Sequence, residues 1–251
     1  MILEARHVSV RYGAHVAVGA VSLDARPGEV LALLGANGSG KSSLLRALAS
    51  LQPHGGAIAW DGGAAPAGSI GYMPQDSAAR PALTVFEVVL LGRMRTLGLR
   101  VGAADIEAAT AAMEEIGIAA LASRRIGELS GGQRQLAMLA QVLAGNPRAL
   151  LLDEPTSALD IAHQLHVLDL LRRATAQRGL TTIAVLHDLN AAARFADRVA
   201  LLQCGQLTGI GRPADILRPA TLGSAFDVHV AVDAGSDGHP VVLPLRARLG
   251  G

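Results

Sequence analysis

Short, almost wholly apolar runs alternate along this chain with segments whose apolar residues recur at helical spacing. Residues 29–34, 150–152 and 182–186 form such runs, and these are typical of strands covered on both faces, as in a mostly parallel sheet. Residues 42–51 and about 161–178 have the helical spacing. This order of strands and helices predicts an α/β fold.

Three segments outside this pattern predict short strands and turns. Apolar positions alternate on both sides of Gly13, so residues 1 to about 25 predict strands joined by turns. Residues 55–71 are rich in Gly, Ala and Pro and are interpreted as a hairpin and a loop. After about residue 226, two Val-rich runs flank a turn at residues 235–238 and predict a small β-rich tail.

Residues 83–145 differ from both groups and predict an inserted helical region. Within it, residues 85–91, 105–116 and 133–144 have helical patterns. The strand–helix rhythm resumes only after this region, at residues 150–152.

Composition excludes several classes of protein. The formal net charge of +1 gives no electrostatic case for binding nucleic acid. Cys204 is the single cysteine, so no intrachain disulfide is possible and a reducing compartment fits. We expect no signal peptide, because the N-terminus lacks a basic region followed by a long apolar run. We expect no membrane span, because no stretch reaches about 18 apolar residues.

Lys41 is the only lysine in the chain, among 21 arginines. It lies in residues 35–42, which read G-x-x-x-x-G-K-S and follow a predicted strand and precede a predicted helix. Lysine is a compact point charge, whereas arginine is a wide planar fork, so a tight loop around phosphates has room only for lysine. The alternative, a glycine-rich surface loop, does not explain the flanking elements or the unique lysine.

This loop predicts a site for the phosphates of a nucleotide. Its backbone N–H groups and the start of the next helix attract anions. Lys41 would bridge β- and γ-oxygens, and the Ser42 hydroxyl would hold Mg²⁺. The candidate nucleotide-binding residues of the loop are Gly35, Asn37, Gly38, Ser39, Gly40, Lys41, Ser42 and Ser43.

Two carboxylates end the apolar run at residues 150–152. A buried strand would place Asp153 at the carboxyl edge of the sheet, where ligands bind in α/β folds. Asp153 is the predicted Mg²⁺ partner through water, and Glu154 is predicted to orient or deprotonate the attacking water. A solvated strand end is the alternative, and it explains one acid but not the conjunction with the phosphate loop.

Residues 129–133, Leu-Ser-Gly-Gly-Gln, complete a set of motifs that resembles the ATPase subunits of ABC transporters. The resemblance covers about residues 1–225, which it implies form one cassette. It implies a P-loop NTPase (RecA-like) core with an N-terminal antiparallel β subdomain. It also implies a helical subdomain inserted at about residues 76–145, with residues 226–251 as the tail.

The resemblance also implies roles for residues outside the phosphate loop. Tyr12 matches the aromatic residue that stacks on adenine, and Gln75 matches the glutamine that senses Mg²⁺ near the membrane partner. Asp160 lies in the loop that crosses the dimer interface, and His187 matches the histidine that contacts the γ-phosphate. Without the family context, Tyr12 and His187 would be interpreted as core residues and Gln75 as a solvated loop residue.

The signature residues Ser130, Gly131, Gly132 and Gln133 would open a helix and offer N–H groups to an anion. In this family that anion is the γ-phosphate bound to another subunit. We therefore expect a head-to-tail homodimer with two ATP molecules between its chains, which opens on hydrolysis. His163 and His166 are spaced like a helical ligand pair, but a solvated helix face is the favoured interpretation.

A single cassette without a membrane span resembles an importer subunit that works with separate permease subunits and, indirectly, a substrate-binding protein. It is expected peripherally on the cytoplasmic face of the bacterial inner membrane. The alternatives are an exporter ATPase with a separate membrane subunit and, from another class, a mechanical ATPase acting on a soluble partner.

Residues 83–93, 159–164 and 187–197 resemble the ATPases of importers for iron chelates, haem and cobalamin. An iron–siderophore complex is the favoured cargo, followed by haem and then cobalamin. Residues 94–102 depart from that group, because they lack its proline-and-aromatic stretch.

Overall fold

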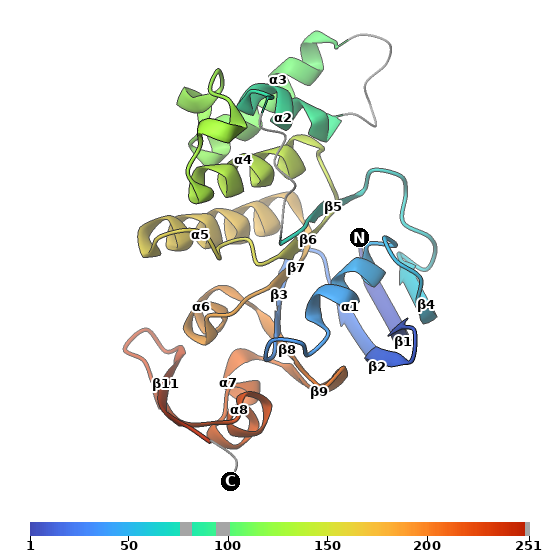
Figure 1. Ribbon diagram of the computed structural model, residues 1–251, viewed down its shortest axis with the longest axis vertical. Coiled ribbons are helices and arrows are strands. Elements are labelled where there is room, and N and C mark those ends of the chain that lie inside the picture. Colours follow the sequence, from blue (N-terminus) through green and yellow to red (C-terminus); the bar gives the residue numbers. More distant parts are fainter. Residues whose placement is uncertain (76–81, 94–100, 249–251) are drawn as a thin grey trace.

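A computed structural model describes residues 1–75, 82–93 and 101–248. Within these residues the main sheet has the strand order β5-β6-β7-β3-β8-β9 (Figure 1), in which only β9 runs antiparallel to its neighbour. The strands of this sheet are β3 (Glu29–Leu34), β5 (Ile70–Met73), β6 (Ala149–Asp153), β7 (Thr181–Val185), β8 (Arg198–Gln203) and β9 (Gln206–Gly211).

The continuous apolar run of β3 reflects burial of both of its faces. Val30, Ala32 and Leu34 belong to a core shared with the helices α4 (Gly131–Ala144) and α5 (Ile161–Arg178). Leu31 and Leu33 belong to a second core shared with α1 (Lys41–Leu48) and the N-terminal strands. Because neighbouring side chains of a strand point to opposite faces, one short run supplies both cores.

The N-terminal strands form a separate antiparallel sheet with the order β2-β1-β4. These strands are β1 (Leu3–Tyr12), β2 (His15–Ala25) and β4 (Gly55–Trp60). The hairpin expected within residues 55–71 is reduced to a tight turn bridged by Trp60 and Gly63, because β4 pairs with β1, about fifty residues earlier. The same segment also contains the start of β5, which joins the main sheet and which its short glycine-containing sequence did not reveal.

The helices between β5 and β6 lie together at the top of Figure 1, away from the C-terminal end of the chain. They are α2 (Val85–Leu90), α3 (Ala103–Ile116) and α4. Thr84 and Glu87 form a reciprocal capping box at the start of α2. The predicted departure at residues 94–102 falls largely on residues 94–100, which lie outside the described residues.

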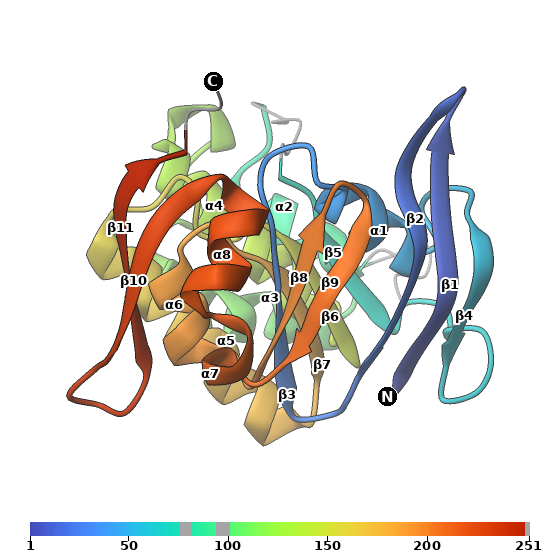
Figure 2. The ribbon, with the colours of Figure 1, turned by 90° about the horizontal axis from the view of Figure 1, so that it is seen from below.

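The C-terminal part contains elements that the sequence pattern left unassigned. They are β8, β9, α6 (Leu189–Phe195), α7 (Pro213–Ile216) and α8 (Pro219–Phe226). The predicted tail strands are β10 (Val228–Ala234) and β11 (Pro240–Ala247), which pair antiparallel. Figure 2 shows this hairpin on the opposite side of the molecule from β1, β2 and β4.

The predicted fold class is confirmed: an α/β core carries an antiparallel β subdomain and a group of helices. The carboxyl ends of β3, β6 and β7 lead directly into the loops that contain the predicted site residues. In the part of the chain that the structure describes, no helix is long and apolar enough to cross a bilayer.

Candidate functional site

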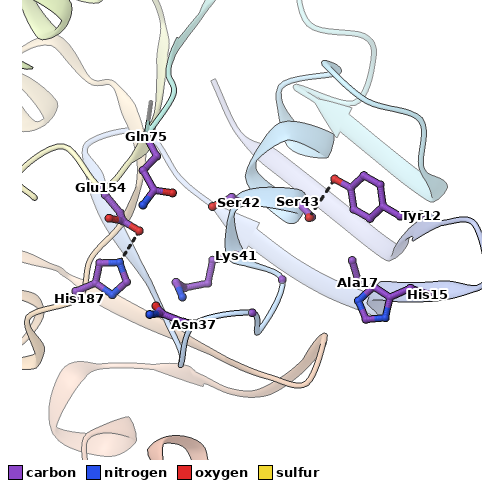
Figure 3. Close-up of a pocket in the computed structure, with 12 residues that line it drawn as sticks. Tyr12, His15, Ala17, Asn37, Lys41, Ser42, Ser43, Gln75, Glu154 and His187 are labelled. Carbon is purple, nitrogen blue, oxygen red and sulfur yellow. Dashed lines mark hydrogen bonds and ion pairs between the residues drawn. The ribbon is translucent and has the colours of Figure 1, made fainter. Parts of the chain in front are cut away.

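A cavity of about 690 Å³ lies between the phosphate loop and the loops that follow β6 and β7. Figure 3 shows Tyr12 and His15 at one side of it, Lys41 and Ser42 in the middle, and Glu154 and His187 at the other. Its lining residues are Tyr12, His15, Ala17, Asn37, Gly38, Gly40, Lys41, Ser42, Ser43, Gln75, Glu154 and His187.

Lys41 is the first residue of α1, and its side chain folds back over its own loop. The ammonium group donates to the carbonyl oxygens of Gly35 at 2.8 Å and Ala36 at 2.9 Å. Burial lowers the pKa of Lys41, while the charges of Glu154 and Asp153 oppose that shift. The cation is thus oriented by backbone oxygens within reach of an incoming anion.

Gly40 precedes α1 in a backbone conformation that only glycine adopts easily, with φ of 99°. A Cβ atom at this position would lie 2.3 Å from the carbonyl oxygen of Ala17. No side chain among the described residues caps the first turn of α1. The N–H groups of this turn are therefore available to a ligand, with the positive end of the helix dipole behind them.

The Ser42 hydroxyl donates to the Asp153 carboxylate at 3.0 Å. This bond joins the start of α1 to the end of β6. Asp153 is only 2% exposed, and burial is the main reason that its pKa is raised, although the Ser42 hydroxyl opposes the shift. A hydroxyl and a carboxylate at this distance are oxygen donors of the kind that Mg²⁺ accepts, so the pair fits that ion.

Glu154 and His187 meet at one side of the cavity, where His187 Nε2 lies 2.5 Å from Glu154 Oε1 (Figure 3). The Glu154 side chain is largely buried, and that of His187 is about half exposed. Glu154 also has a positive φ of 55°, which is uncommon for a residue with a side chain and is found at functional sites. The two residues come from the ends of adjacent parallel strands, β6 and β7.

Tyr12 lies at the mouth of the cavity with its side chain half exposed. Its hydroxyl donates to Gln52 Oε1 at 2.8 Å and lies 3.3 Å from the Ser43 hydroxyl. These hydrogen bonds, with that of Ser43 the largest, lower the pKa of Tyr12. The ring is therefore fixed by contacts with α1 and the residues just after it, and its face remains accessible.

The remaining predicted residues do not line the cavity. Gly35 and Ser39 belong to the phosphate loop but are absent from the cavity lining, and Ser39 is 4% exposed. Asp160 caps α5 by accepting a hydrogen bond from the backbone N–H of His163 at 2.9 Å. The signature residues Ser130, Gly131, Gly132 and Gln133 begin α4 and are absent from the cavity lining.

His163 contacts Asp160 at 2.8 Å, while His166 is exposed. Within the described residues, no group of His, Cys, Asp and Glu side chains could hold a metal ion as a cluster. The exposure of both side chains agrees with a solvated helix face for the two histidines.

His15 and Ala17 line the cavity but were not among the predicted residues. His15 is the cross-strand neighbour of Tyr12, because a tight turn joins β1 to β2. The register between β1 and β2 is set by their connecting turn, which Gly13 indicates. The pairing of Tyr12 with His15 could therefore have been derived from the sequence. The position of Ala17 against Gly40 depends on tertiary packing and had no such signal.

Comparison with known proteins identifies the family. A model described as "ABC transporter" matches residues 18–157. The chain belongs to the ABC transporter ATPase family. The matched region contains the phosphate loop, the signature residues and the β6 carboxylates.

The relatives of this ABC ATPase include import proteins that match along nearly their whole length. The hemin import ATP-binding protein HmuV of Gloeobacter violaceus is 41% identical, over 97% of this chain and 94% of the relative. The protein of the same name from Myxococcus xanthus is also 41% identical, over 97% of both chains. The chain is thus an importer-type ABC ATPase.

Solved structures agree with the fold. A metal-chelate type ABC transporter in an inward-facing conformation has a TM-score of 0.86 at 30% identity, over 97% of both chains. A dimeric ATP-binding cassette bound to ADP and phosphate has a TM-score of 0.74 at 27% identity, over 85% of this chain and 99% of the other.

Proposed function

We propose that the chain is the ATP-hydrolysing subunit of an importer for an iron chelate, with haem as the first candidate cargo. The juxtaposition of the Glu154–His187 pair with the phosphate loop across one cavity carries the ATPase part of this proposal. Both chemical groups that hydrolysis needs, an anion-binding loop and a base, face the same space.

Each residue of the site has a proposed role. Lys41 and the N–H groups at the start of α1 bind the β- and γ-phosphates. Glu154 holds the attacking water and accepts its proton, while His187 contacts the γ-phosphate. Mg²⁺, held by Ser42, Gln75 and Asp153, would neutralise the charge that develops on the phosphate oxygens. Tyr12 stacks on the base.

The signature residues are proposed to complete the site of a second copy of the chain. Ser130 to Gln133 do not line the cavity of their own chain, yet they begin a helix whose N-terminus favours an anion. A head-to-tail dimer would bring each signature to the partner's γ-phosphate, with Asp160 near the interface. The dimeric ADP- and phosphate-bound relative supports this arrangement.

We also propose a peripheral position on the cytoplasmic face of the bacterial inner membrane, bound to permease subunits that receive cargo from a binding protein. The names of the import relatives support this assignment. They favour haem over the siderophore complex predicted from the sequence, and the metal-chelate relative is compatible with both. Cobalamin, a cobalt chelate, is also compatible with the metal-chelate relative but has no support from the names of the import relatives.

Substitution Glu154→Gln tests the ATPase proposal. It removes the proton acceptor but keeps the shape, so turnover should fall by at least about a hundredfold while ATP still binds. ATP should then hold the variant as a dimer, which size-exclusion chromatography with and without ATP detects. A variant that hydrolyses ATP like the parent and stays monomeric would contradict the proposal.

Membrane co-purification and transport test the partner and the cargo. The chain should pellet with a multi-span permease, whereas a mechanical ATPase with a soluble partner should not. With the complex in proteoliposomes, a haem-loaded binding protein should stimulate ATP hydrolysis and uptake. Stimulation by a ferric siderophore complex but not by haem would support the siderophore cargo predicted from the sequence.

A further inference from the structure

We infer that Gln135 is a positioning residue for Glu154 and joins the signature helix of a chain to the catalytic glutamate of the same chain. This inference rests on the proposed role of Glu154. Gln135 lies in the second turn of α4, outside the four signature residues.

The side-chain amide of Gln135 makes two hydrogen bonds to the loop that follows β6. Its Nε2 donates to the carbonyl oxygen of Glu154 at 2.6 Å. Its Oε1 accepts from the backbone N–H of Ala158 at 3.0 Å. One side chain therefore spans the loop from its first residue to its fifth, and it uses both ends of its amide.

Glu154 needs such support because its backbone lies in the left-handed region, with φ of 55°. A residue with a side chain pays about 1–2 kcal/mol in that conformation, so surrounding contacts must hold it. The Glu154 carbonyl accepts three bonds: that from Gln135, one from the Ser157 hydroxyl at 3.2 Å and one from the Ser157 backbone N–H at 3.3 Å. The orientation of this peptide sets the direction of the Glu154 side chain toward His187.

The other end of the same loop is held from α5. Gln164 Nε2 donates to the carbonyl oxygens of Thr156 at 3.2 Å and Leu159 at 3.0 Å. Gln164 touches neither Glu154 nor α4 in these bonds. Of these two glutamines, Gln135 is the one that connects the signature helix α4 to the Glu154 carbonyl.

The signature itself packs against the loop. A Cβ atom on Gly132 would lie 3.0 Å from Leu159 Cδ2 and 3.2 Å from the carbonyl oxygen of Ala158. A shift of α4 when a partner's phosphate arrives would thus be transmitted to residues 154–159, both by this contact and by the Gln135 amide. Glu154 would be aligned only when the partner's nucleotide engages the signature, which couples the two sites of a dimer.

Substitution Gln135→Met removes both hydrogen bonds and keeps the length of the side chain. We expect kcat for ATP hydrolysis to fall about tenfold, since small misplacements of a catalytic group are costly. The KM for ATP and the affinity of the monomer for ATP should change by less than about twofold, because Gln135 does not line the cavity. The Hill coefficient for ATP should fall toward one.

Substitution Gln135→Glu separates the effects of the two hydrogen bonds, because it keeps the one to Ala158 and removes the one to Glu154. The carboxylate still accepts from Ala158 N–H, but it repels the Glu154 carbonyl oxygen until it is protonated. Its kcat, divided by that of the parent at each pH, should therefore rise as the pH is lowered, because protonation of the introduced carboxyl restores a donor to the Glu154 carbonyl oxygen. The ratio for Gln135→Met should stay flat.

Gln141→Met is the matched control, since Gln141 lies on the same helix and its side-chain oxygen has no hydrogen-bond partner among the described residues. It should retain the parental kcat. A parental kcat in Gln135→Met, or equal losses in both Met variants, would overturn the inference. If Gln135→Met does not fold, the pH ratio of Gln135→Glu decides, and a flat ratio refutes the inference.

Failure of this inference can be told apart from failure of the proposed function. If Glu154→Gln abolishes turnover and traps a dimer while Gln135→Met hydrolyses ATP normally, only the positioning role is wrong. If Glu154→Gln itself hydrolyses ATP normally, the assignment of Glu154 is wrong, and the positioning role falls with it.

Discussion

Two helix starts in this molecule, those of α1 and α4, have the same kind of anion-attracting N-terminus but very different surroundings. The first turn of α1 has no side-chain cap among the described residues, and it opens into the cavity. The first turn of α4 is closed by its own capping box, in which Ser130 Oγ accepts from Gln133 N–H and Gln133 Oε1 accepts from Ser130 N–H.

The difference shows which half of the nucleotide site a single chain can complete. At α1, Lys41 and the N–H groups of the first turn are already oriented, so a phosphate has no side-chain cap to displace. At α4, the serine and glutamine of the signature satisfy each other until something replaces the cap. We therefore expect α1 to determine the ATP affinity of the monomer and α4 to determine dimer formation.

The largest expected effect belongs to the α1 site. Lys41→Ala removes the charged donor and should weaken ATP binding by about a hundredfold, since a hydrogen bond to a charged group contributes about 1.5–3 kcal/mol. Calorimetric titration of the monomer with ATP measures this. Lys41→Arg keeps the charge and tests whether the loop has room for a guanidinium. Unchanged affinity in Lys41→Ala would show that Lys41 does not bind the phosphates.

A matched pair of glycine substitutions distinguishes the two helix starts. Gly40→Ala forces a Cβ atom to 2.3 Å from the Ala17 carbonyl oxygen at a positive φ, which should destabilise the monomer by about 2 kcal/mol. Gly131→Ala meets only an ordinary contact, 3.6 Å from Ala158 Cβ, and should leave monomer stability within about 0.5 kcal/mol.

Thermal unfolding and ATP-induced dimerisation, measured on both glycine variants, separate these effects. Gly131→Ala should lose the dimer trapped by ATP in the Glu154→Gln background although its monomer is intact. A Gly131→Ala chain that unfolds as early as Gly40→Ala would show that the α4 start is as tightly packed as that of α1.

Ser130→Ala should have a smaller effect on the monomer. It removes the cap of α4, and loss of an N-cap costs about 1 kcal/mol, which chemical denaturation can resolve. Gln133→Ala removes the other half of the capping box and should cost less, because it leaves the Ser130 hydroxyl in place. If Ser130→Ala is as stable as the parent, the capping box contributes nothing in the free chain.

The smallest effect is a shift in the reactivity of Lys41. Burial lowers its pKa, so the neutral, nucleophilic amine forms at a lower pH than in an exposed lysine, whose pKa is about 10.4. Amine-reactive labelling, followed by peptide mass spectrometry, should find Lys41 and the N-terminus. ATP should protect Lys41 and raise its labelling midpoint, since phosphate charge favours the ammonium form. Labelling that ATP does not alter would contradict this.

The sequence predicted the parts of the fold that depend on local pattern. The apolar runs of β3, β6 and β7, the helical spacing of α3 and α5, and the tail hairpin were all recognisable. The strand β5 was missed because Ile70-Gly71-Tyr72-Met73 is short and lies at an edge of the sheet. The partner of β4 was missed because pairing between distant segments leaves no local trace.

The candidate site was predictable to a similar extent. Motif spacing named Lys41, Ser42, Asp153 and Glu154, and the family resemblance named His187. The structure brings these five together around the phosphate loop. Gln135 could not be singled out, because its proposed role depends on hydrogen bonds to the Glu154 carbonyl and the Ala158 N–H, which lie in a loop distant in the sequence. His15 was overlooked although its pairing with Tyr12 follows from the turn.

The sequence by itself determined the chemistry of this ABC ATPase. The phosphate loop, the paired carboxylates and the signature are short local patterns, so residue identity and spacing are enough to recognise them. Only the tertiary structure decided how these parts face one another. It closed Glu154 against His187, left the start of α1 open and that of α4 capped, and joined the signature helix to the glutamate through Gln135. Contacts of this kind depend on side chains that packing brings together from distant positions, and residue order does not encode them locally.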